Sequence, residues 1–141
     1  METTGPASDD DLGPQVALLN ARSAIAELRA AYNFAVDQGD VDAVVATFTD
    51  DGVFRTGQIV QEGRAALRQF FTEVAESPSV YHLVANEVLD RLDGQDAEGR
   101  AYIVVVDRQS KAIVTIGWYE DRLTRTTDGW RFVERTFHPE V

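Results

Sequence analysis

The sequence predicts an α+β domain, with helices at the start of the chain and a long, curved antiparallel or mixed sheet at the end. Three observations predict this class. Apolar residues recur every three or four positions in the first half, as in a helix, and every second position in the second half, as in a strand. The length of 141 residues suits one core. Helices followed by a run of strands are typical of α+β domains.

The first periodic segment predicts a helix from about Gln15 to Gln38. Its main apolar side repeats at helical spacing: Leu18, Ala21, Ile25, Leu28, Tyr32 and Ala35. Another side carries Ala26, Ala30, Phe34 and Asp37. A helix that is apolar on two sides is expected to pack on both, so we place this one between the sheet and a further layer. Gly39 is expected to end it.

The segment before this helix differs from the rest in composition. Residues 1–14 mix Gly, Pro, Ser, Thr and Asp with almost no large apolar side chain. Such a segment is expected to form a flexible acidic arm. The domain organisation is therefore an arm over 1–14 and a single domain over 15–141.

Two more helices are expected after the first. Asp40 is a suitable N-cap for a short helix that reaches Phe48. The pattern over 63–76 predicts a third helix, which Ser-Pro-Ser ends.

The remaining elements are strands separated by polar turns. The sequence Asp-Asp-Gly at 50–52 predicts a turn before a short strand at 53–55, with 59–61 as its hairpin partner. A paired-carboxylate site in this DDG segment is less favoured than an ordinary turn. Alternating apolar residues then predict four long strands, at 80–92, 97–107, 112–125 and 130–138. The charges in EDRLTRTTD and RFVER are expected to form cross-strand ion pairs on an outer face.

Composition excludes several classes of function. The chain has 24 acidic and 13 basic side chains, with a formal net charge of −11. Nucleic acids and anionic membranes both attract basic surfaces, so neither is an expected partner. Without cysteine there is no disulfide or thiolate chemistry. No metal-ligand spacing or Gly-rich phosphate loop occurs, so no cofactor is expected. No apolar run approaches a membrane span, and we expect a cytoplasmic protein.

A curved sheet with helices on its concave side leaves a pocket, and we look for ionisable residues that face it. Histidine is the side chain best suited to proton transfer near neutral pH. His82 lies early in a strand with two largely apolar faces, so its ring is expected to be at least half-buried. Asp37 is its candidate partner, because a carboxylate in the last helical turn meets the negative end of the helix dipole and needs compensation. The alternatives are an exposed Asp37 and a structural His82 in the core.

Four segments resemble the SnoaL-like branch of the nuclear-transport-factor-two superfamily. They are AYNFAVDQGDVDAVVATFTDDGVF, EGRAALRQFF, YHLVANEVLDRLDGQDAEGRAYIVVV and GWYEDRLTRTTDGWRFVERT. The resemblance runs from Val16 to Phe137 and implies a cone of three N-terminal helices on the concave face of a curved sheet, enclosing a pocket. An Asp that ends the first helix and a His that opens the long strand also match the catalytic dyad of the scytalone dehydratase and hexachlorocyclohexane dehydrochlorinase families.

By this resemblance, His82 would take a proton from carbon, and Asp37 would orient the ring and stabilise its charged form. The implied activity is that of a cofactor-independent lyase or isomerase, dehydratase-like, acting on a hydrophobic hydroxylated or carbonyl compound. In the dehydrochlorinases, two cationic side chains assist the leaving halide. The matching positions here are Tyr32 and His138, which supply no fixed cation, so halide loss is not expected. The alternative is a non-catalytic small-ligand-binding or assembly subunit of the same fold.

Further residues are expected to bind the substrate: Tyr32, Asn86, Trp118 and His138. Tyr32 would donate a hydrogen bond to a substrate oxygen, and Asn86 follows His82 by four residues on the same strand face. An Asn there also commonly satisfies neighbouring backbone groups. Trp118 and Tyr119 point to opposite faces, so one lines the cavity and the other meets solvent or a second subunit. The uncovered sheet face predicts a homodimer or homotrimer.

Overall fold

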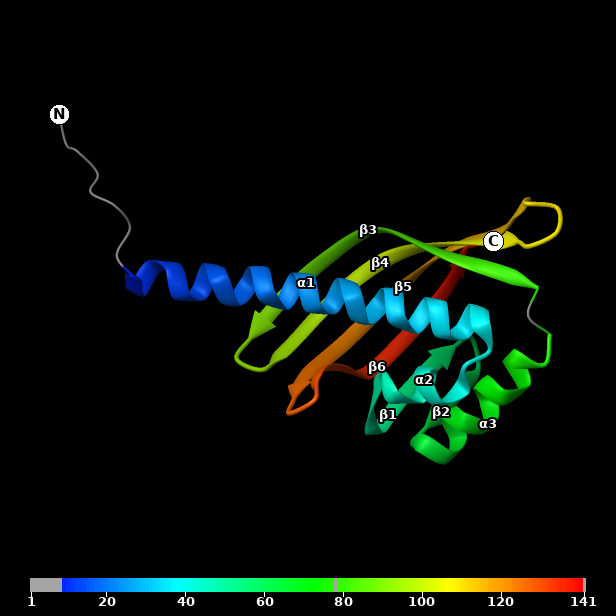
Figure 1. The fold of residues 1–141 in the computed structure, drawn as a ribbon, viewed down its shortest axis with the longest axis horizontal. Helices are drawn as coiled ribbons and strands as arrows, with labels where there is room; N and C mark the ends of the chain where they lie inside the picture. Colours follow the sequence, from blue (N-terminus) through cyan, green and yellow to red (C-terminus); the bar gives the residue numbers. More distant parts are fainter. Residues whose placement is uncertain (1–8, 78, 141) are drawn as a thin grey trace.

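The computed structural model describes residues 9–77 and 79–140 (Figure 1). The helices are α1 (Asp9–Gln38), α2 (Val41–Ala46) and α3 (Arg64–Ala75). The strands are β1 (Phe48–Thr56), β2 (Ile59–Glu62), β3 (Val80–Asp93), β4 (Asp96–Asp107), β5 (Ile113–Thr126) and β6 (Gly129–Glu140). None of these helices is long and apolar enough to cross a membrane.

All the strands belong to one six-stranded sheet with the order β2-β1-β6-β5-β4-β3. The β1–β6 pair is parallel and the other pairs are antiparallel, so the sheet is mixed and unclosed. The helices lie on one side of it, with α1 running across its long strands (Figure 1). The predicted α+β class, with helices on one face of a curved sheet, is confirmed.

Several boundaries differ from those expected from the sequence. The short helix that was expected to reach Phe48 ends at Ala46, and Phe48 is instead the first residue of β1. Helix α1 begins at Asp9, so only residues 1–8 of the expected arm lie outside the described residues. Pro14 lies inside α1 as its sixth residue, just beyond the free N–H groups of the helix start, so the hydrogen bond to the carbonyl oxygen of residue 10 is missing there. The segment 50–52 is part of β1, because a register shift against β6 between Phe48 and Val53 absorbs it as a bulge.

The core lies between α1 and the concave face of the sheet. The expected apolar side of α1 is buried there: Ala21, Ile25, Leu28, Tyr32 and Ala35. The Tyr32 ring meets the rings of Phe48, Phe71 and Phe132 edge to face, at centroid distances of 5.8–6.1 Å. This aromatic cluster joins α1 to α3 and the sheet, and so fixes the position of the helix above the strands.

The end of α1 is set by a left-handed glycine. Gly39 has φ +71, which favours glycine, and the backbone N–H of Asp40 returns to the carbonyl oxygen of Ala35 at 2.9 Å. The Asp40 carboxylate then caps α2 by accepting from the backbone N–H of Ala43 at 3.1 Å. Asp37 is therefore held in the last turn of a helix that cannot continue.

Candidate active site

Asp37 and His82 form a direct pair between the end of α1 and the start of β3. The ring Nδ1 of His82 lies 2.6 Å from Oδ1 of Asp37, and the backbone N–H of His82 donates to Oδ2 at 3.0 Å. The side chain of His82 is 18% exposed and that of Asp37 is 13% exposed. Because both carboxylate oxygens are engaged by one residue, the ring and the carboxylate are held in one relative orientation.

This geometry defines the state of the imidazole. An ionised carboxylate can only accept hydrogen bonds, so Nδ1 of His82 carries the proton that faces Asp37. In the neutral ring, Nε2 then keeps a lone pair and is available to a ligand. When Nε2 takes a proton, the adjacent Asp37 carboxylate stabilises the imidazolium that forms. The pair therefore has the chemistry of a general base with a fixed tautomer.

A pocket of about 490 Å³ lies over this pair, between α1, β3 and β4. Its walls are mainly small or aliphatic, as at Ala30, Val84 and Val106. Such a volume and lining suit a small, largely apolar ligand. The residues of its wall that carry polar or ionisable groups are Asn33, Asp37, Tyr81, His82 and Glu87.

The side of α1 that faces the pocket is the second apolar side recognised in the sequence. Ala26, Ala30, Phe34 and Asp37 all line the pocket. On β3, His82 pairs with Val105 and Val84 pairs with the buried Ile103, so alternation turns His82 and Val84 toward the helix. The structure thus brings together the two residues that the sequence predicts as a dyad.

Arg108, a residue outside the predicted site, connects the two halves of the site. It follows β4, and its Nε donates to the backbone carbonyl oxygen of Val80 at 3.0 Å. The same guanidinium donates to the backbone carbonyl oxygen of Asp37 and lies 4.8 Å above the Tyr81 ring. One cation therefore holds the last turn of α1 and the first residues of β3. An arginine in a polar turn gives no sequence signal for this role.

Replacing Arg108 with Ala is expected to lower the free energy of unfolding by about 1.5–3 kcal/mol, because two carbonyl groups lose a charged donor. Urea denaturation followed by circular dichroism measures this change. Arg125→Ala is the matched control, since Arg125 is exposed on β5. Equal stability of both variants would show that Arg108 does not join the two elements.

A buried ionic cluster lies between α1 and the sheet. Asp121 Oδ2 is 3.0 Å from Nε of Arg29, and its Oδ1 is 3.2 Å from Nε of Arg135. All three side chains are at most 3% exposed. Arg29 also lies 3.7 Å from Glu87, a residue of the pocket wall. The Arg135 guanidinium covers the Tyr119 ring at 3.5 Å.

The cluster corrects the expectation that these charges lie on the outer face. Asp121 and Arg135 are opposite each other on β5 and β6, so they are a cross-strand pair, but they point into the core. Glu120 and Asp121 are adjacent and both acidic, so the sequence does not indicate which of them points into the core. The outer face instead carries the pair of Arg122 and Glu134.

Tyr32 and Tyr119 are interior residues rather than pocket residues. Both are at most 3% exposed, and neither is in the pocket wall. Burial raises the pKa of each phenol above its ordinary value, so both stay neutral at physiological pH. Of the pair whose direction the sequence left open, Tyr119 faces the interior and Trp118 faces outward. Tyr32, expected to bind substrate, is part of the aromatic core.

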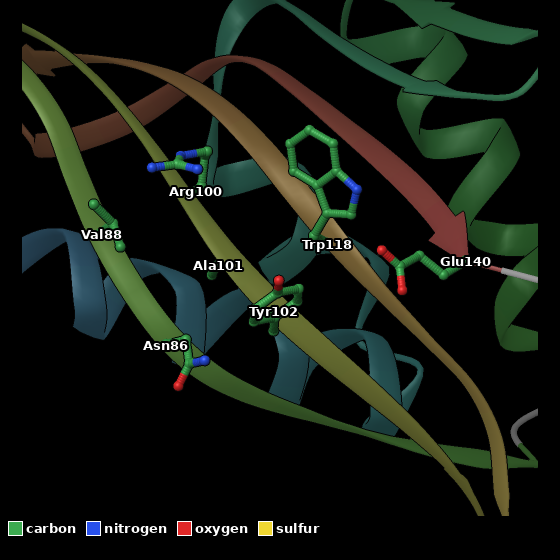
Figure 2. Close-up of a pocket in the computed structure, with 7 residues that line it drawn as sticks. All are labelled: Asn86, Val88, Arg100, Ala101, Tyr102, Trp118 and Glu140. Atoms are coloured by element: carbon green, nitrogen blue, oxygen red, sulfur yellow. The ribbon is translucent and has the colours of Figure 1, made fainter.

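The other expected substrate-binding residues lie on the opposite face of the sheet. Figure 2 shows Asn86 and Trp118 in a hollow on the face turned away from α1. His138 stacks on Trp118 with ring centroids 4.2 Å apart, and its Nε2 lies 3.0 Å from Glu120. The structure does not bring these three residues to the dyad.

A bulge in β3 explains the position of Asn86. The register against β4 shifts between Ala85 and Val88, and Asn86 has φ +52. A bulge inserts a residue and reverses the alternation beyond it. Asn86 therefore leaves the face of His82, and Glu87 takes the inward position beside α1.

Comparisons with known proteins agree with this architecture. A family model described as a SnoaL-like domain matches residues 17–136. The uncharacterized protein Rv2910c of Mycobacterium tuberculosis is 30% identical over 128 residues, covering 85% of this chain and 86% of its own. The solved structure of a single-site variant of Rv3472, a protein of unknown function from the same species, has a TM-score of 0.81 at 28% identity. The match covers 96% of this chain and 78% of the Rv3472 chain.

A structure from Novosphingobium aromaticivorans, provisionally identified as a scytalone dehydratase, has a TM-score of 0.79 at 19% identity. The match covers 91% of this chain and 89% of that one. At this identity the likeness shows a common fold. Because the family model spans nearly all of the described residues, the chain belongs to the SnoaL-like domain family.

Proposed function

We propose that the protein is a cofactor-independent lyase or isomerase that abstracts a proton from carbon, with His82 as the base and Asp37 as its orienting partner. The observation that carries this proposal is the 2.6 Å contact between Nδ1 of His82 and Oδ1 of Asp37 in the wall of an apolar pocket. A base with a fixed tautomer beside a small-molecule cavity has the parts that proton transfer needs.

The proposed reaction begins at Nε2 of His82. Its lone pair takes a proton from a carbon next to a carbonyl group, and the electrons of the C–H bond move onto the carbonyl oxygen to form an enolate. The imidazolium then protonates a departing hydroxyl group, which leaves as water, or returns the proton to another carbon of the same system. The first outcome is a dehydration and the second an isomerisation, and neither consumes a co-reactant.

The pocket supports a hydrophobic substrate. Its aliphatic walls favour apolar rings, and the net charge of −11 disfavours anionic compounds. Membership of the SnoaL-like family and the shared fold of a protein provisionally identified as a scytalone dehydratase are consistent with dehydration. Halide loss is not proposed, because the expected partners of a leaving halide are absent from the pocket: Tyr32 lies in the core and His138 on the outer face.

The experiment that tests this function joins a binding screen to product analysis. Hydrophobic hydroxy-carbonyl and hydroxylated ring compounds that raise the thermal midpoint are ligands of the native state. Each is then incubated with the protein and followed by mass spectrometry and NMR. We expect at least one ligand to lose water or to isomerise. If every ligand is recovered unchanged, the protein is the non-catalytic binding subunit of the same fold.

We also propose that the protein self-associates, as a homodimer or homotrimer, through the outer face of the sheet. This face exposes large apolar side chains, including Leu83, Tyr102 and Ile116. Tyr102→Glu is expected to shift the particle mass measured by light scattering toward that of a single chain. Gln38→Glu, on exposed helical surface, is the control. A monomeric wild-type protein would contradict this proposal without affecting the dyad.

A further inference from the structure

Asn33 is a polar side chain that the fold itself does not use. It is 4% exposed, yet neither Nδ2 nor Oδ1 has a hydrogen-bond partner within the described part of the chain. Buried amides are normally paired, because an unpaired one keeps the full cost of losing water. Asn33 also lies in the wall of the pocket that holds Asp37 and His82.

The position of Asn33 on α1 relates it directly to the dyad. Asn33 and Asp37 are four residues apart, so they lie on one side of the helix, about 6 Å apart along its axis. When His82 contacts the C–H group of a carbonyl compound, the carbonyl oxygen of that compound can reach the turn of α1 that carries Asn33. The two groups thus suit adjacent atoms of one ligand.

The chemistry of the amide suits an oxygen on which negative charge develops. Nδ2 supplies neutral donors, which stabilise an oxyanion without adding a cation that would oppose protonation of His82. Tyr32, the donor expected from the sequence, lies in the aromatic core. Tyr81 also carries a neutral donor in the pocket wall, but it is 39% exposed and its ring lies against Arg108. Asn33 is therefore the better candidate, because a donor shielded from water acts more strongly on a developing charge.

We propose that the Asn33 amide binds the reacting oxygen of the substrate, donating from Nδ2 to the carbonyl oxygen that becomes an enolate when His82 removes the adjacent proton. This inference rests on the proposed function and assigns a hydrogen-bond donor to the carbonyl oxygen that gains charge in the proposed reaction. The substrate is a carbonyl compound with an acidic C–H beside the carbonyl group, rather than a simple alcohol. No group is oxidised or reduced: the C–H bond breaks, an N–H bond forms at Nε2, and the electron pair moves to oxygen.

The test uses 1-tetralone, a hydrophobic ketone, in D₂O, with NMR following loss of the C–H signal beside its carbonyl group. Asn33→Leu keeps the approximate volume of the side chain and removes the donor. We expect the exchange rate at saturating ketone to fall about 100–1,000-fold, the usual effect of deleting one oxyanion donor. The matched control, Asn20→Leu, makes the same change at an exposed site on α1 and should leave the rate unchanged.

Thermal stability separates this role from a structural one. Asn33→Leu should unfold at the same temperature as the wild type or higher, because it removes an unpaired buried amide. A lower midpoint with an unchanged exchange rate would overturn the proposal and make Asn33 a packing residue. If the wild type and Asn33→Leu exchange the ketone at the same rate, the Asn33 proposal fails, while the proposal that His82 is the base still holds. If the wild type exchanges no carbonyl compound in the ligand panel, the proposed function itself fails.

Discussion

Replacing His82 with Gln, or Asp37 with Asn, is expected to lower turnover of the true substrate by at least about a hundredfold. The Gln side chain has no basic nitrogen, so the His82 variant cannot accept the proton. In the Asp37 variant, the amide can donate to Nδ1, which places the ring proton on Nε2 and leaves no lone pair toward the substrate. Steady-state kinetics on the compound identified by the ligand screen measures both losses.

The double variant makes this prediction more specific. If the two residues act as one unit, His82→Gln combined with Asp37→Asn should be about as slow as either single variant, rather than slower by the product of the two effects. Asp42→Asn is the matched control, because that carboxylate is 83% exposed in a surface ion pair with Arg68. Unchanged kinetics in both dyad variants would exclude the pair from the reaction.

Asp121→Ala is expected to lower the free energy of unfolding by about 3–5 kcal/mol. The substitution leaves Arg29 and Arg135 as buried cations without their shared counter-charge. A buried ion that loses its partner retains the cost of leaving water, which exceeds the value of an ordinary hydrogen bond. Chemical denaturation with urea measures the difference.

A surface pair provides the control for this prediction. Asp50 pairs with Arg64, and its side chain is 87% exposed, so Asp50→Ala should leave the urea midpoint nearly unchanged. Replacing the three buried residues together, by Met at 29 and 135 and Leu at 121, is expected to recover much of the loss. A cost for Asp121→Ala no greater than that for Asp50→Ala would contradict the structural role of the cluster.

The sequence predicted the scaffold well because its main periodicities are simple. Ala21, Ile25 and Leu28 recur at helical spacing, and one apolar row suffices to orient α1. The long strands alternate clearly and are separated by turn residues. Asp37 and His82 could be paired because each lies at the end of a recognisable element, and because their combination matched a known dyad.

Other site residues could not be placed from the sequence for particular physical reasons. The segment VANEV carries no clear signature of a bulge. Simple alternation therefore predicts that Asn86 shares the face of His82, whereas the register of β3 shifts at this point. Asp121 is buried only because arginines from α1 and β6 meet it, which depends on tertiary structure. Asn33 lies between two apolar sides of α1, and only the packed structure shows that its amide is unpaired.

The central claim is that His82, held by Asp37, removes a proton from carbon. The most direct test compares deuterium incorporation from D₂O into a bound carbonyl ligand by the wild type and by His82→Gln. Both proteins must be saturated with ligand, as confirmed by equal shifts of the thermal midpoint. The expected result is deuterium at one carbon with the wild type and only the uncatalysed rate with His82→Gln. Equal incorporation by both proteins would contradict the claim.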